Sequence, residues 1–412
     1  MEGDNQKKFI RSYIGAFAFL VVLQIYFNNI ATVELSALQQ EKRLEEFNFI
    51  RGSINSAGVD KDINYLLSKV KITMEKKHDT NNLQNKDEIR MRGNVVSENE
   101  LKSEDKIKAI LEDAGMVITP EIESKLPTWE EVVSLYGPKP IIHGLDSACS
   151  EFQRTVPASD AYIGPAGLFN TGTNLLPKLL HDYCELPSRT NSLESDLLDE
   201  GMLLSMPWGK HNPVAWRNKN VMRGAEEIVQ NHTLPLVLIK DPYFWMGSMC
   251  RHWYESEWED VDRCPNLVQG NSTKKTYPVE VRYKQGEPNW EYQSLADFWN
   301  TWYGDYLASM DEFPMLMIRY EDLLFHTEEV ITKVCECGGG QLKEKAKSEG
   351  IQLRVDSAKH GYSHEDSNGL FSSIMRYGHV NQRLGELNEY DLRYAKETIG
   401  SDLMEKFGYS FP

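Results

Sequence analysis

Short apolar runs recur along the chain beyond residue 140, and each is followed by polar or glycine-rich residues. The runs are Ala161–Ile163, Leu234–Ile239 and Met315–Ile318. Short continuous runs of this kind are typical of strands buried inside a parallel sheet. Apolar residues at helical spacing occur in Leu175–Leu180 and Leu295–Leu307. This alternation predicts an α/β fold in which helices flank a P-loop-type parallel sheet.

A glycine-rich turn joins the first apolar run to the helix that follows it. Its sequence is Gly167-Leu-Phe-Asn-Thr-Gly172-Thr-Asn174. Glycines allow the backbone to approach a ligand closely, and the first turn of a helix offers unpaired N–H groups that favour an anion. The spacing of the glycines is that of a nucleotide-phosphate loop, but a nucleoside-triphosphatase loop continues with Gly-Lys-Ser/Thr, where this chain has Thr173-Asn174. The turn therefore predicts a phosphate site without a loop lysine.

The N-terminal part of the chain carries one long uncharged run, Tyr13–Phe27, which extends to about Val33. About 20 residues at 1.5 Å each cross a bilayer, and basic residues before the run orient the N-terminus to the cytosol. We therefore expect a cytosolic tail (1–12) and a retained signal anchor (13–33), which attaches the protein to a membrane with type II topology. A cleaved signal peptide is the alternative. In both cases the rest of the chain is lumenal or extracellular.

The segment that follows, 34–104, is rich in Lys, Glu, Asp, Asn and Gln and poor in aromatic residues. Such a composition does not support a folded core, so we interpret it as a solvated stem. Two short amphipathic helices, Ile107–Leu111 and Trp129–Tyr136, are expected within a helical lead-in at 105–140. The main domain then occupies 141–412.

Net charge excludes one class of partner, and cysteine content indicates the compartment. The formal net charge of −17 argues against a nucleic-acid partner, and any polyanionic ligand needs a local basic cleft. Six cysteines form an even set suited to disulfides in an oxidising compartment, and we expect Cys250 and Cys264 to pair. Cys335-x-Cys337 lacks the second pair of a zinc site, so no metal is expected. Glycosylation sequons begin at Asn231 and Asn271.

A second motif follows the second apolar run and consists of Lys240-Asp-Pro with Ser248 eight residues past the lysine. Together with the glycine-rich turn, it resembles the sulfotransferase family. Members of that family carry a loop close to Lys-Thr-Gly-Thr-Thr for the 5′-phosphosulfate of 3′-phosphoadenosine 5′-phosphosulfate (PAPS), and Arg-Asp-Pro-x5-Ser for its 3′-phosphate. The resemblance covers residues 141–412 and implies PAPS as the co-substrate. It implies cofactor contacts at Asn170, Thr171, Gly172, Thr173, Asn174, Lys240 and Ser248, and at Arg376 through Arg376-Tyr-Gly378.

Between the two motifs a short apolar stretch, Gly201–Met206, leads to Lys210 and His211. Ligands of parallel α/β sheets gather at the carboxyl ends of strands, so we expect this pair beside the phosphate loop. Sulfuryl transfer, like phosphoryl transfer, needs a base for the acceptor hydroxyl and cations for the developing charge. His211 is the candidate base and Lys210 the candidate cation. Cytosolic members of the sulfotransferase family have a Lys-x-His in a similar place, whereas the two residues are adjacent here. A capping or surface role is the alternative for His211.

Two residues depart from the pattern of the family. Asn170 stands where the family has its loop lysine, and it offers a hydrogen bond but no charge, so we expect Lys210 to replace that lysine. Lys240 stands where the family has an arginine, which keeps the charge and loses bidentate geometry. We therefore expect 3′-phosphate binding that is weaker but retained.

The resemblance and the expected topology together predict a membrane-anchored sulfotransferase of the Golgi or another secretory compartment, with a lumenal catalytic domain at 141–412. It would transfer a sulfuryl group from PAPS to a hydroxyl, or less favourably an amine, of a glycan. Two alternatives remain open. A P-loop kinase shares the strand, loop and helix but needs a loop lysine and a metal-binding Ser/Thr. A non-catalytic lumenal protein that binds nucleotide or glycan is suggested by Asn170.

Overall fold

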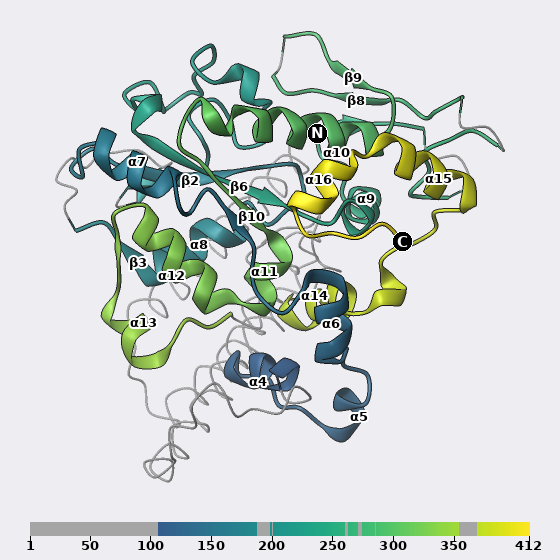
Figure 1. Cartoon of the computed structure of the whole chain (residues 1–412), viewed down its shortest axis with the longest axis horizontal. Helices are drawn as coiled ribbons and strands as arrows, with labels where there is room; N and C mark the ends of the chain where they lie inside the picture. Colours follow the sequence, from purple (N-terminus) through teal and green to yellow (C-terminus); the bar gives the residue numbers. More distant parts are fainter. Residues whose placement is uncertain are drawn as a thin grey trace, which may run out of the picture. The chain divides into compact units, whose positions relative to one another are not determined.

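The computed structural model describes residues 106–187, 198–199, 201–259, 263–270, 274–284, 286–353 and 369–412. All of them belong to one compact unit of the chain (Figure 1). The predicted cytosolic tail, signal anchor and stem lie outside the described residues. No helix in the part of the chain that is described is both long and apolar enough to cross a membrane.

The described chain begins with three helices and then alternates between strands and helices. The strands are β1 (Ile142–His143), β2 (Tyr162–Gly167), β3 (Cys184–Glu185), β4 (Leu198–Asp199), β5 (Met202–Leu203), β6 (Thr233–Ile239), β7 (Ser256–Glu257), β8 (Val279–Val281), β9 (Trp290–Tyr292), β10 (Leu316–Arg319) and β11 (Gln341–Leu342). The helices are α4 (Lys106–Asp113), α5 (Pro120–Glu123), α6 (Trp129–Tyr136), α7 (Ala148–Thr155), α8 (Leu175–Tyr183), α9 (Pro242–Arg251), α10 (Leu295–Ala308), α11 (Tyr320–Phe325), α12 (Thr327–Cys337), α13 (Glu344–Glu349), α14 (Gly369–Gly378), α15 (Glu389–Thr398) and α16 (Ser401–Lys406). Short 3₁₀ helices span Val214–Trp216, Gln230–His232, Ser309–Asp311 and Val380–Gln382.

The main sheet has the strand order β1-β10-β6-β2-β5-β4. Its central strands β10, β6, β2 and β5 run parallel, and β2 pairs with β6 along its whole length. The edge strands β1 and β4 are antiparallel to their neighbours. The predicted α/β class is confirmed. The prediction of a parallel sheet holds for the central strands and is wrong at both edges.

The length of the connections explains the edge at β4. Two residues separate β4 from β5, and so short a connection makes a hairpin, whereas a parallel neighbour needs a crossover of a dozen or more residues. Gly201 lies in this turn with a φ of 91°, a left-handed conformation that glycine adopts at little steric cost. An antiparallel edge strand on an otherwise parallel sheet, as at β1, is a common arrangement.

Helices cover both faces of the sheet (Figure 1). On one face, α8 and α12 pack together, and α8 contacts β2 and β5. On the other, α10 runs across the strands and packs against α9, α15 and α16. The predicted strands and helices of the domain, including the two in the lead-in, are confirmed as elements, since β2, β6, β10, α4, α6, α8 and α10 overlap the expected ranges. The segment between α9 and α10 forms a small antiparallel sheet, β7-β8-β9.

Aromatic residues of α10 hold the strand ends in place. The Trp299 indole donates to the carbonyl oxygen of Lys240 at 2.9 Å, and the Trp302 indole donates to that of His211 at 3.1 Å. The Tyr303 hydroxyl donates to the Leu238 carbonyl at 2.7 Å. Burying a polar group without a hydrogen-bond partner destabilises the fold. These contacts therefore fix both the aromatic rings and the backbone that follows the strands.

Three disulfides cross-link the described part of the chain, and they are Cys149–Cys337, Cys184–Cys335 and Cys250–Cys264. The predicted Cys250–Cys264 pair is confirmed. The other two attach the end of α12 to α7 and to β3, across 188 and 151 residues of sequence. Such a set of disulfides is typical of an oxidising secretory or extracellular environment.

Candidate functional site

The glycine-rich loop lies between the end of β2 and the start of α8. Gly172 has a φ of 89°, and a Cβ atom there would lie 2.6 Å from the ring of Tyr320, so the position requires glycine. Within the described chain, the backbone N–H groups of Gly172, Thr173 and Asn174 have no acceptor. These three residues line a cavity of the described domain. Unpaired N–H groups before a helix favour an anion, so the geometry of the loop is compatible with the phosphate site that the sequence predicts.

The side chains of Asn170 and Thr171 are bonded within the protein. Asn170 has a φ of 65°, and its Nδ2 donates to the carbonyl oxygens of His252 at 2.7 Å and Ser248 at 3.3 Å. These bonds satisfy carbonyl groups at the C-terminal end of α9. Thr171 is fully buried, and its hydroxyl donates to the Leu168 carbonyl at 2.7 Å. The sequence predicts ligand contacts for both residues, but the structure gives both side chains internal partners.

Lys210 and His211 lie beside the end of β2, where the sequence predicts them. The backbone N–H of Gly167 donates to the carbonyl of Lys210 at 2.8 Å, and Lys210 Nζ donates to Asn174 Oδ1 at 2.6 Å. His211 Nδ1 lies 2.7 Å from the carbonyl oxygen of Gly167. Because a carbonyl only accepts, Nδ1 carries the proton, and Nε2 is the basic nitrogen of the neutral ring. The imidazole packs against Phe169, with ring centroids 4.6 Å apart.

The second motif forms a buried polar cluster at the end of β6. Lys240 is 2 % exposed, and its Nζ donates to the carbonyl of Asn170 at 2.5 Å and to Tyr377 Oη at 3.1 Å. Ser248 Oγ lies 3.2 Å from Tyr377 Oη and accepts a bond from Arg251 Nη2 at 2.9 Å. The loop and the second motif, 70 residues apart in sequence, are thus in direct contact.

Two buried acidic residues next to this cluster fix the backbone at the start of α9. Asp241 caps α9 by accepting bonds from the first two backbone N–H groups after Pro242, and it pairs with Arg383 at 2.8 Å. Glu321 accepts the backbone N–H of Asp241 at 3.1 Å and the hydroxyl of Tyr409 at 2.8 Å. Burial, together with the charge of Asp241, raises the pKa of Glu321 to about 7. Both carboxyl groups therefore position the start of α9 and with it Ser248.

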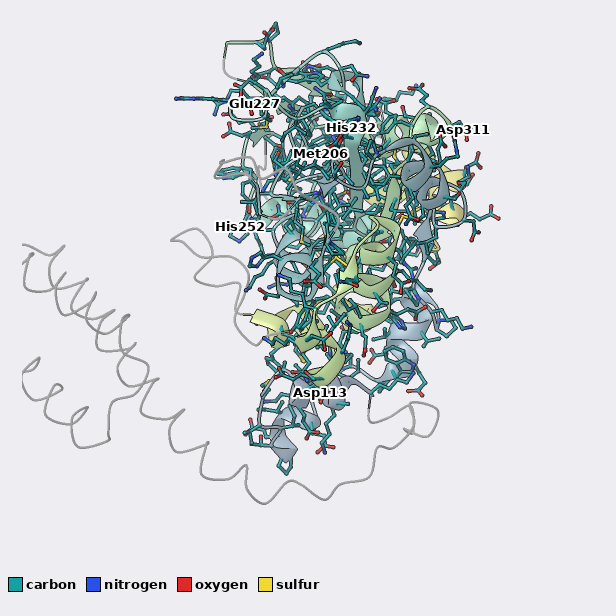
Figure 2. All side chains as sticks on the ribbon, turned by 90° about the vertical axis from the view of Figure 1, so that its left-hand side faces the viewer. Asp113, Met206, Glu227, His232, His252 and Asp311 are labelled. Carbon is teal, nitrogen blue, oxygen red and sulfur yellow. A yellow bond between two sulfur atoms is a disulfide. The ribbon has the colours of Figure 1, made fainter. Side chains whose placement is uncertain are left out.

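The loop and the cluster line a single cavity of about 430 Å³. This volume lies within the range of roughly 300–1,000 Å³ that is usual for small-molecule sites. The basic side chains on its wall outnumber the acidic ones, Asp182 and Glu255, in a chain whose net charge is −17. His252, also on the wall, is labelled on the left-hand side of the described residues in Figure 2. The basic residues are Lys178, Lys210, Lys240, Arg251 and Arg376.

All the residues predicted for the site line this cavity, with the exception of Thr171. Sequence analysis missed Arg251, Tyr320 and Tyr377. Arg251 lies three residues after Ser248 on α9, and this spacing places two side chains on one helix face, so its position could have been noticed. Tyr377 lies inside the triplet that was singled out for Arg376. Tyr320 lies two residues after the predicted strand Met315–Ile318, and ligands gather at the carboxyl ends of parallel strands, so its position could also have been noticed.

No group of three or more His, Cys, Asp or Glu side chains among the described residues could hold a metal ion. The chain was compared with protein-family models, with curated proteins and with solved structures, and none of the three comparisons gave a match. The motifs and the cavity they line are therefore the basis for assigning a function.

Proposed function

We propose that the cavity is the donor site of a sulfotransferase, which transfers a sulfuryl group from PAPS to a hydroxyl, or less favourably an amine, of a glycan. The observation that carries this proposal is the contact between the two motifs, in which Lys240 Nζ donates to the carbonyl of Asn170. The contact lies at the carboxyl ends of β6 and β2, which are parallel neighbours. Ligands of parallel α/β sheets bind at such ends.

The residues present fit PAPS, which carries two anionic groups, the 5′-phosphosulfate and the 3′-phosphate. The unpaired N–H groups of Gly172, Thr173 and Asn174 suit the 5′-phosphosulfate. Lys240 and Ser248, at the other motif, suit the 3′-phosphate, in agreement with the resemblance. When bound, PAPS supplies the activated sulfuryl group together with its leaving group.

The residues beside the loop have the properties that transfer requires. The Gly167 carbonyl accepts from Nδ1 of His211, and we assign the role of base to the other ring nitrogen, Nε2, which would take the proton of the acceptor hydroxyl. Lys210 lies next to Asn174, and partial burial lowers the pKa of its ammonium group. We assign to Lys210 the stabilisation of charge on the leaving oxygen. The Asn170 amide is less suited to that role, because it is bonded to the end of α9.

A secretory location supports a glycan as the acceptor. The three disulfides indicate an oxidising compartment, and Asn231, which begins a sequon, is exposed. Asn271 lies outside the described residues. We place the protein in the Golgi or another secretory membrane, anchored by residues 13–33, with the described domain in the lumen.

The test is transfer of isotope-labelled sulfate. The full chain, made in a secretory expression host, would be offered labelled PAPS and a mixed glycan library, and we expect label on a glycan. Binding of adenosine 3′,5′-bisphosphate without transfer to any glycan would favour the non-catalytic alternative. Magnesium-dependent ATP turnover would favour the kinase. Failure to bind nucleotide at all would overturn the proposal.

A further inference from the structure

The ammonium group of Lys240 is buried at the end of β6. Among the described residues, no Asp or Glu oxygen lies within ion-pair distance of its Nζ, although the residue is 2 % exposed. Its contacts are the Asn170 carbonyl, the Tyr377 hydroxyl, and the faces of two rings, Tyr320 with its centroid at 3.9 Å and Tyr377 at 4.5 Å. A buried charge is costly unless an opposite charge or a set of hydrogen bonds compensates it.

The Tyr377 oxygen lies at the point where the donors of this cluster converge. Lys240 Nζ is 3.1 Å away and Ser248 Oγ is 3.2 Å away. Ser248 is in turn held by Arg251 Nη2 at 2.9 Å, and its own hydroxyl lies 2.9 Å from the carbonyl of Phe244. An oxygen of a bound phosphate would use the same donors, because phosphate oxygens accept hydrogen bonds from ammonium groups and hydroxyls.

The serine allows two proton arrangements. With a neutral phenol, Tyr377 donates to Ser248 Oγ, and Ser248 donates to the Phe244 carbonyl. With an ionised phenol, Ser248 turns its proton towards Tyr377 and still accepts from Arg251. The phenolate then accepts from both Ser248 and Lys240, so the cluster can satisfy either form without moving a side chain.

We propose that the ionised Tyr377 phenol, through its Oη, is the internal counter-ion of an anion site whose donors are Lys240 and Ser248. An incoming phosphate takes over these two donors, and the phenolate takes up a proton from solvent. The inference rests on the proposed function only in taking a phosphorylated nucleotide as the ligand. The proton balance is simple, because one proton passes from buffer to Tyr377 and no other bond changes.

The pKa values of the two partners follow from burial and from their mutual attraction. Burial lowers the pKa of the Lys240 ammonium group, and the charge of Tyr377 and its hydrogen bond to Lys240 oppose that shift. Burial on its own would raise the pKa of the Tyr377 phenol, but the charges of Lys240 and Arg251 and the bond from Ser248 outweigh it and lower that pKa to about 7. The neighbouring phenol of Tyr320 behaves in the opposite way, since burial and the charge of Tyr377 raise its pKa. Among the described residues, the charged and titratable groups next to Tyr377 are Lys240, Arg251, Tyr320 and, from α6, Tyr136, and Tyr320 in turn has Glu321 and Arg376 as neighbours.

The experiment records the near-ultraviolet absorbance of tyrosinate in the full-length protein. About one pH unit above its pKa, roughly nine-tenths of a phenol is ionised. We therefore expect one tyrosinate at a pH of about 8 in the unmodified protein, none in Tyr377→Phe, and one in Tyr320→Phe, the matched control. Adding saturating adenosine 3′,5′-bisphosphate, or inorganic phosphate in a parallel titration, should abolish the signal of the unmodified protein.

The outcomes separate this inference from the proposed function. Absence of a tyrosinate in the unmodified protein, or its persistence in Tyr377→Phe, overturns the inference. A signal that survives nucleotide binding, with binding proven by calorimetry, also overturns it and leaves the proposed function intact. Loss of the signal with inorganic phosphate but no binding of nucleotide upholds the exchange of phosphate for the Tyr377 phenolate, and it removes the nucleotide as the ligand and with it the proposed function. The titration of the unmodified protein requires no variant, so misfolding of Tyr377→Phe would not prevent the test.

Discussion

The two ends of the cavity present positive charge in different ways. At the loop end the donors are backbone N–H groups and Lys210, whose side chain is partly exposed. At the other end the donors are buried side chains that are already bonded to one another, since Lys240 is 2 % and Ser248 is 3 % exposed. A buried network is fixed before a ligand arrives, whereas a partly exposed cation can move towards charge that develops during a reaction. We therefore expect the loop end to determine the rate and the Lys240 end to determine the affinity.

Replacing the candidate base should have the largest effect. We expect His211→Ala to lower kcat by roughly 10²–10⁴ and to remove the acidic limb of the pH–rate profile, because the acceptor hydroxyl loses its proton acceptor. His252→Ala is the matched control, since His252 also lines the cavity and its backbone carbonyl, which holds Asn170, is retained. A normal acidic limb in His211→Ala would show that another group is the base.

Removing the cation at the loop end should have the second-largest effect. We expect Lys210→Ala to lower kcat by roughly 10²–10³ with little change in the dissociation constant for nucleotide, because its contact strengthens mainly as the leaving oxygen gains charge. Lys178→Ala is the control, since Lys178 lines the same cavity but pairs with Asp182 at 3.3 Å. Steady-state rates and calorimetry on the same preparations measure both quantities. Equal losses in the two variants would mean that only the general charge of the cavity matters.

Substitutions at the Lys240 end of the cavity should lower the affinity for nucleotide. We expect Lys240→Ala and Ser248→Ala each to weaken binding of adenosine 3′,5′-bisphosphate by about tenfold or more, since a hydrogen bond to a charged group contributes roughly 1.5–3 kcal/mol. Calorimetry gives the dissociation constants, and thermal unfolding shows whether the fold is retained. Unchanged affinity in both folded variants would remove these residues from the site and reverse the assignment of the two ends.

The frame of this site follows from local sequence patterns, whereas its contacts depend on distant residues. The apolar runs that end at Ile163 and Ile239 were sufficient to predict β2 and β6, because continuous apolar runs are typical of strands with both faces covered. The antiparallel edge at β4 depends on the length of one turn that the pattern did not reveal. The pairing of Cys149 with Cys337 could not be predicted either, because spacing does not fix which of six cysteines meet.

The same limit applies to the side chains of the cavity. The sequence placed Asn170 in the phosphate loop, but its amide partners are carbonyls 78 and 82 residues away at the end of α9. Tyr377 stands beside Arg376 in the chain, and the packing of α14 against α11 and α6 brings its hydroxyl oxygen to Lys240. Residue type and spacing identified the charges of the site, and tertiary packing decided which of them are paired.

The smallest expected effect, and the sharpest comparison of the two ends, comes from restoring the lysine of the family. Asn170→Lys in the Lys210→Ala background should recover part of the lost rate, because the new ammonium group would lie at the loop end and could stabilise the same leaving oxygen. The recovery should be partial, since asparagine tolerates the φ of 65° at this position better than lysine does, and the bonds that Asn170 makes to His252 and Ser248 would be lost. The left-handed backbone alone should cost roughly 1–2 kcal/mol of stability, which thermal unfolding would record. Asn170→Gly in the same background is the control, because it loses the same bonds without adding a charge. If both double variants recover equally, or neither recovers while nucleotide still binds, the charge at the loop end is not what limits the rate.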